Sequence, residues 1–125
     1  MLSFRTYTIV QENKDTINSF VCGCKDHLNL QDEPQINLVD SPEDGMTTGS
    51  FNPNTKEIKV LAGPRALVDI LRSIAHELVH QQQLEQGKLH ATSGEDGSPE
   101  ENEAHSIAGL LMRKFEKDNK HIYSQ

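Results

Sequence analysis

The pattern of hydrophobic and polar positions predicts a strand, a helix and a second strand in the first third of the chain. Residues 4–10, FRTYTIV, alternate and are rich in residues that favour strands, so we expect a first strand there. An amphipathic helix is predicted over about residues 16–28, with Asp15 as its N-cap. The segment 35–40, QINLVD, predicts the second strand.

The middle of the chain predicts a hairpin followed by a long helix. Two short runs, 47–51 and 57–61, flank the turn-forming sequence NPNT, which is typical of a hairpin connection. A glycine-proline pair at 63–64 then begins a long amphipathic helix that we expect to end at Gly87.

A last helix is predicted from Ser98 to about residue 117. We expect Ser98 to be the N-cap, Pro99 the first helical residue and Glu101 the partner of Ser98 in a capping box. Together the elements predict an α+β fold in which one helix and a small mixed sheet of three to four strands pack on two long helices. A chain of 125 residues has room for one compact domain, so we assign residues 1–125 to a single domain.

Composition excludes several classes of function. The formal charge is −7 and the basic residues are mostly scattered, which argues against nucleic-acid binding. No apolar run is long enough to span a membrane, and no secretion signal is apparent, so a cytoplasmic location is expected. Cys22 and Cys24 are expected to be free thiols in a reducing compartment, with Cys24 in the core. The sequence leaves the oligomeric state open.

The sequence HELVH at residues 76–80 is the most informative motif. On a helix, His76 and His80 lie one above the other on the side away from the apolar residues, so both imidazoles can reach one ion. Glu77 points about 100° away, where it can reach a water held by that ion. Catalytic zinc takes three protein ligands and keeps a position for water, so a third ligand must come from elsewhere in the chain.

The last predicted helix offers candidates for the third ligand. Glu103 lies on its apolar face, where a carboxylate is costly unless it is paired or binds a metal, and Glu100 shares that face one turn earlier. We therefore expect Glu103 as the ligand and keep Glu100 as the alternative, while Glu101 is assigned to capping. His105 is about 200° around the helix from Glu103, so we expect it to face away and to be solvated.

HELVH followed by Glu101-Asn-Glu-Ala104 resembles the gluzincin zinc metallopeptidases, in particular the minigluzincins, the ImmA/IrrE-type peptidases and related phage-encoded proteins. The resemblance implies a minimal zincin fold, a phage or bacterial origin and hydrolysis of a peptide or protein substrate, more as an endopeptidase than as an exopeptidase. It also implies one zinc ion per chain with His76, His80 and Glu103 as ligands and Glu77 as general base.

Two features of thermolysin-like gluzincins have no clear counterpart here. Their acid four residues after the ligand glutamate, which orients a ligand histidine, corresponds to Ile107. Their transition-state-stabilising histidine or tyrosine is also unassigned, and the candidates are His90, Tyr7, His121 and Tyr123.

In the expected mechanism, zinc lowers the pKa of a bound water and polarises a peptide carbonyl, while Glu77 takes the water's proton and passes it to the leaving amine. An edge strand of the hairpin is expected to pair with an extended substrate. The alternative is a non-catalytic zinc domain, structural or regulatory, with a relict site, which the retained Glu77 disfavours. A peptide-deformylase-like site with Cys22 or Cys24 as third ligand lacks the surrounding cysteine motif.

Overall fold

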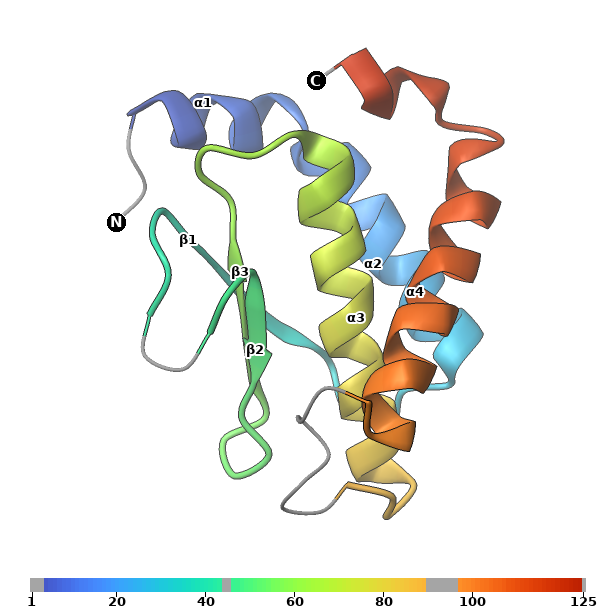
Figure 1. The fold of residues 1–125 in the computed structure, drawn as a ribbon. Helices are drawn as coiled ribbons and strands as arrows, with labels where there is room; N and C mark the ends of the chain where they lie inside the picture. Colours follow the sequence, from blue (N-terminus) through green and yellow to red (C-terminus); the bar gives the residue numbers. More distant parts are fainter. Residues whose placement is uncertain (1–3, 44–45, 90–96, 125) are drawn as a thin grey trace.

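In the residues that the structure describes, the protein has an α+β fold of four α-helices and a small three-stranded mixed sheet (Figure 1). The computed structural model describes residues 4–43, 46–89 and 97–124. The elements in chain order are α1 (Phe4–Glu12), α2 (Lys14–Leu28), β1 (Gln35–Val39), β2 (Gly49–Phe51), β3 (Glu57–Leu61), α3 (Leu67–Glu85), α4 (Pro99–Glu116) and the 3-10 helix η1 (Lys120–Ser124).

The strands are ordered β1-β3-β2, so β3 is the central strand and β2 lies at an edge. β1 pairs parallel to β3, whereas β2 and β3 form the antiparallel hairpin that the sequence predicts. Ile58 and Val60 of β3 are fully buried and carry the hydrophobic face of the sheet against the helices. The mixed sheet, the hairpin and the two long helices of the prediction are confirmed.

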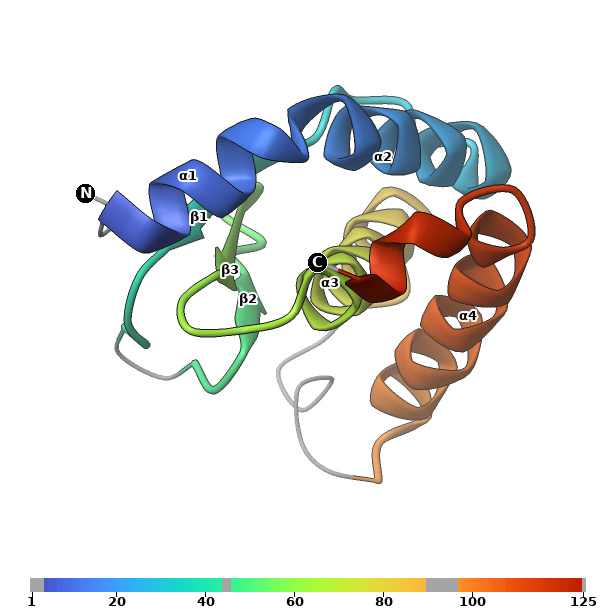
Figure 2. The same ribbon diagram turned by 90° about the horizontal axis from the view of Figure 1, so that it is seen from above.

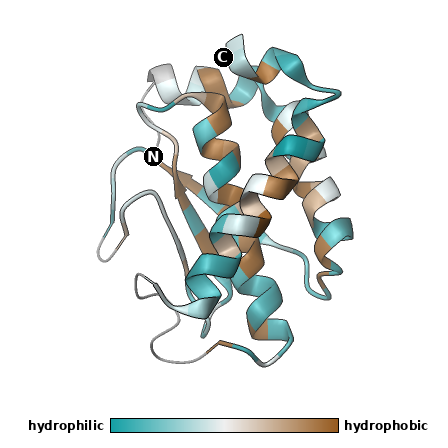
Figure 3. Ribbon diagram, turned by 45° about the vertical axis from the view of Figure 1, so that its right-hand side comes forward, coloured by the Kyte–Doolittle hydropathy of each residue, from teal (hydrophilic) through white to brown (hydrophobic). Residues whose placement is uncertain are grey.

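Helix α3 lies at the centre of the molecule, between the sheet and α4 (Figure 2). Its apolar stripe is fully buried and consists of Leu67, Ile70, Leu71, Ile74 and Leu78. Its polar side is also largely enclosed, because α4 and the edge strand β2 pack against it. Hydrophobic and hydrophilic residues alternate along the helices (Figure 3). Polar residues of α3, among them Glu77, His80 and Gln83, are buried together with its apolar ones.

The expected strand at residues 4–10 is wrong, since this segment belongs to helix α1. A contact with a distant part of the chain explains the difference. The Thr6 hydroxyl is buried and donates to Asp40 Oδ1 at 2.8 Å, which ties α1 to the end of β1. Such tertiary contacts outweigh the intrinsic strand preference of the segment.

The predicted helix ends are partly correct. Helix α2 begins at Lys14 with Asn13 as its N-cap, so Asp15 lies inside the first turn, where its charge favours the helix dipole, rather than at the cap. Ser98 caps α4 as predicted, because its Oγ accepts from the Glu101 N–H at 3.1 Å. Helix α3 ends at Glu85, and Gly87 follows with a φ of 73°, the left-handed conformation that glycine adopts readily.

Within the described residues, no helix is long and apolar enough to cross a membrane.

Candidate metal centre

Two adjacent helices bring a carboxylate between the histidines of HELVH. His76 and His80 project from α3, and Glu101 projects from the first turn of α4. Glu101 Oε1 lies 2.7 Å from His76 Nε2, and Glu101 Oε2 lies 3.1 Å from His80 Nε2. The side chains of His76, His80 and Glu101 are 16%, 10% and 14% exposed, so the cluster is sheltered but not sealed.

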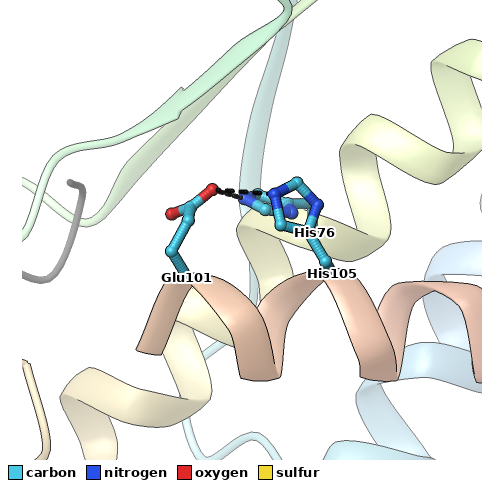
Figure 4. Close-up of side chains that lie close together, drawn as sticks. All are labelled: His76, Glu101 and His105. Atoms are coloured by element: carbon cyan, nitrogen blue, oxygen red, sulfur yellow. Dashed lines mark ion pairs between the residues drawn. The ribbon is translucent and has the colours of Figure 1, made fainter. Parts of the chain in front are cut away.

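His105 adds a third imidazole to the cluster. It follows Glu101 by one helical turn, its Nε2 lies 3.5 Å from Glu101 Oε1, and its ring centroid lies 4.5 Å from that of His76 (Figure 4). One donor atom from each of His76, Glu101 and His105 lies within 4.8 Å of the others. The expectation that His105 faces away is therefore wrong, because residues four apart share a helix face and Glu101 is the residue at the site. The side chain of His105 is 68% exposed, as expected for a solvated histidine.

The structure does not bring Glu103 to the histidines. Its Oε1 instead accepts a hydrogen bond from Gln83 Nε2 at 2.8 Å. Glu100 is buried elsewhere on the helix, and its backbone oxygen accepts from the same Gln83 nitrogen at 2.9 Å. Glu101 therefore stands where Glu103 was expected, and its carboxylate turns to the histidines rather than back to Ser98.

The signal that identifies Glu101 is the i, i+4 pair that it forms with His105. Ala104, Ala108 and Met112 are buried on α4, and Glu101, which precedes them by three, seven and eleven residues, lies on the same face, toward the histidine-bearing side of α3. The face that carries Glu103 is the less buried one, since Leu110, seven residues further along it, is 40% exposed. Two metal-binding side chains one turn apart, Glu101 and His105, could have indicated the correct face.

Glu77 is buried between the histidines and the edge strand. It is 6% exposed, and burial together with the charge of Glu101 raises its pKa to about 8. A Cβ atom at Gly49 in β2 would lie 2.9 Å from Glu77 Oε2, so the strand backbone passes directly beside the carboxylate. Burial also lowers the pKa of His76, against the opposing charge of Glu101, and so favours the neutral imidazole that a metal requires.

The other residues considered from sequence have contacts elsewhere. His121 Nε2 lies 3.2 Å from Thr16 Oγ1, and the Tyr123 hydroxyl donates to Glu116. Tyr7 is exposed on α1. His90 lies outside the described residues.

Both cysteines are free thiols, as predicted. Cys24 lies in the hydrophobic core, and burial raises the pKa of its thiol to about 12. Cys22 is exposed on α2. A thiol that is neutral and packed in the core is a poor candidate for a metal ligand.

The donor set fits zinc. Imidazole nitrogen and carboxylate oxygen are among its usual ligands, and His76, His80 and Glu101 supply the two-histidine, one-glutamate combination of catalytic zinc sites. A carboxylate that faces three imidazole nitrogens also offers the negative charge that a divalent cation needs. No family model, no curated protein and no solved structure matches the chain, so its function is inferred from this site.

Proposed function

We propose that the protein is a zinc-dependent peptidase with His76, His80 and Glu101 as metal ligands and Glu77 as general base. The observation that carries this proposal is the Glu101 carboxylate, which joins the two HELVH histidines at 2.7 and 3.1 Å while Glu77 lies buried next to them. Glu101 replaces Glu103 in the ligand set expected from sequence. One ion per chain remains the expected content.

Zinc held by these residues would lower the pKa of a water and polarise a peptide carbonyl. The chain's own residues have separate tasks. His76, His80 and Glu101 would hold the ion in a fixed position, because all three side chains are carried by helices that pack together. Glu77 is adjacent in sequence to a ligand but points elsewhere, so its carboxylate stays free for proton transfer.

Glu77 is suited to accept and release a proton. A carboxyl group whose pKa lies near neutrality holds a transferred proton more readily than an ordinary glutamate does. In the proposed reaction Glu77 takes a proton from the attacking water and delivers it to the amine that leaves. This pKa is that of the metal-free site, and a bound dication would lower it, so that the carboxylate is ionised and can accept the proton.

The edge strand β2 supports an extended peptide as substrate. Gly49 places the backbone of β2 beside Glu77, and in the described part of the chain no further strand pairs with the outer side of β2. A peptide can add to such an edge by main-chain hydrogen bonds and would then pass the general base.

His105 favours a second candidate function, a non-catalytic zinc domain. Structural zinc sites use four protein ligands, and a donor atom of His105 lies close to those of His76 and Glu101, so His105 could supply a further ligand. The buried Glu77 argues against this candidate, because a closed site has no use for a base. His105→Ala separates the two: a structural site would lose most of its zinc affinity, whereas the three-ligand site keeps one zinc per chain.

The test of the proposed function combines zinc analysis with cleavage of a broad peptide library, for wild type and for Glu77→Gln. We expect both proteins to hold one zinc per chain, and only the wild type to cleave peptides. Glu77→Gln keeps the size and most of the polarity of the buried side chain, so it is a matched control for folding. A zinc-loaded wild type that cleaves no peptide would support the structural candidate instead.

A further inference from the structure

Gln83 connects the candidate metal centre to Glu103, the residue that the sequence predicted as a metal ligand. Its side chain is completely buried on α3, one turn after His80. Gln83 Oε1 lies 2.7 Å from His80 Nδ1. Gln83 Nε2 donates to the backbone oxygen of Glu100 at 2.9 Å and to Glu103 Oε1 at 2.8 Å. All the hydrogen-bonding capacity of the amide nitrogen is therefore used on α4.

These contacts fix the orientation of the amide. The backbone oxygen of Glu100 and the carboxylate of Glu103 can only accept, so the amide nitrogen of Gln83 must face them. The amide oxygen then faces His80, and an oxygen can only accept from Nδ1. In the neutral imidazole the proton is therefore on Nδ1, and Nε2 keeps its lone pair.

The bare nitrogen points toward Glu101. His80 Nε2 lies 3.1 Å from Glu101 Oε2, so two acceptors face each other when the ring is neutral. Such an arrangement repels unless a proton or a cation lies between the two atoms. The hydrogen bonds of Gln83 thus prepare His80 for a cation at this point.

We propose that Gln83, held in place by Glu103, is a positioning residue that keeps His80 in the Nδ1–H tautomer and presents Nε2 as the metal-binding atom. The proposal rests on the metal site of the proposed function and adds the partner that orients one of its ligands. Glu103 acts through Gln83 and does not bind the metal itself. Its carboxylate, directed at the interface of α3 and α4, has a partner that explains its position.

Gln81 provides a matched control on the same helix. It is also almost completely buried, and its Nε2 also donates to a backbone oxygen and a carboxylate, those of Asp32 and Glu85. The difference is its Oε1, which has no hydrogen-bond partner among the residues that the structure describes. Gln81→Met therefore removes the same type of buried amide as Gln83→Met, without removing a contact to a histidine.

The first test needs no substitution. In metal-free wild-type protein with ¹⁵N-labelled histidine, imidazole nitrogen shifts at alkaline pH report which ring nitrogen carries the proton. We expect His80, assigned by its loss in His80→Asn, to carry the proton on Nδ1. A proton on Nε2 would overturn the proposal. This readout does not depend on zinc binding or peptide cleavage, so it can fail or succeed independently of the proposed function.

The second test measures zinc affinity by competition with a chelator. We expect Gln83→Met to weaken zinc binding by about 10- to 100-fold, as loss of a partner of a ligand histidine typically does, and Gln81→Met to leave it within about threefold of wild type. Glu103→Gln keeps an acceptor for Gln83 and should bind zinc more tightly than Glu103→Met. Equal losses in the Gln83 and Gln81 variants would reduce Gln83 to a structural role and contradict the proposal. A wild type that binds no zinc would instead contradict the metal site.

Discussion

Gly49 of β2 lies against the carboxylate of Glu77, and a Cβ atom at this glycine would come within 2.9 Å of Glu77 Oε2 and 3.3 Å of the Lys59 backbone oxygen. The strand backbone therefore limits where the Glu77 carboxylate, the proposed general base, can point. An added methyl group must displace either the base or the edge strand, since both contacts are closer than ordinary packing allows.

Gly49→Ala should consequently reduce activity without removing the metal. We expect peptide cleavage to fall by about 10- to 100-fold, because small displacements of a reacting group are costly, while zinc content stays at one per chain. Gly23→Ala is the control, since a Cβ at that helical position meets no atom within 4 Å. Unchanged cleavage in Gly49→Ala would show that Glu77 has freedom that the structure does not indicate.

The ligand assignment predicts different losses at two nearby glutamates. Glu101→Ala removes the carboxylate that contacts both histidines and should abolish measurable zinc binding. Glu103→Ala removes only the partner of Gln83 and should weaken zinc binding by about 10-fold. Metal analysis after dialysis against dilute chelator distinguishes the two, and a reversed order would restore the assignment expected from sequence.

Metal-free protein should become less stable as the pH rises through the range in which Glu77 ionises. Folding raises the pKa of Glu77 from 4.5 to about 8, so the folded chain favours the protonated carboxyl. The contribution of Glu77 to the free energy of unfolding is therefore complete below pH 4.5 and is lost as the pH approaches 8. The free energy of unfolding should fall by up to about 1.4 kcal/mol per pH unit from this group alone. Glu77→Gln lacks the ionisation.

Urea denaturation with a chelator present, at several pH values, measures this effect as the difference between wild type and Glu77→Gln. The difference should change across the window from about pH 4.5 to 8. The other titrating groups contribute equally to both proteins. A difference that stays constant with pH would mean that Glu77 is not desolvated in the folded chain.

The two cysteines should differ in reactivity. Cys22 is exposed, whereas burial of Cys24 raises its thiol pKa to about 12 and blocks access to reagents. Mass spectrometry should find one modified thiol per folded chain and two after unfolding. In Cys22→Ser the folded protein should remain unmodified, and rapid labelling of that variant would place Cys24 outside the core.

Local patterns were sufficient to predict the elements with their own strong signals. The NPNT turn gave the hairpin of β2 and β3, and Ser98 with Pro99 gave the start of α4. Residues 4–10 were assigned wrongly because alternation is a local property, whereas the helix there is tied by Thr6 to Asp40, more than thirty residues later.

The site could be predicted only as far as one helix determines it. The positions of His76, Glu77 and His80 follow from the period of a single helix, and the structure brings them together with Glu101. The choice between Glu101 and Glu103 depends on how α4 is rotated against α3, which is set by packing across the interface rather than by either sequence segment. Glu103 was correctly identified as a carboxylate that needs a partner, and that partner is Gln83.

The position of α3 at the centre of the molecule restricts how the site can move. The helix that carries His76, Glu77 and His80 is enclosed by the sheet, α2 and α4, so it cannot tilt or unwind without exposing the core. The proposed base and two of the proposed ligands therefore form the stationary part of the protein. Any adjustment to a substrate has to come from the elements packed around α3. Of these, the short edge strand β2 has the fewest backbone hydrogen bonds to break.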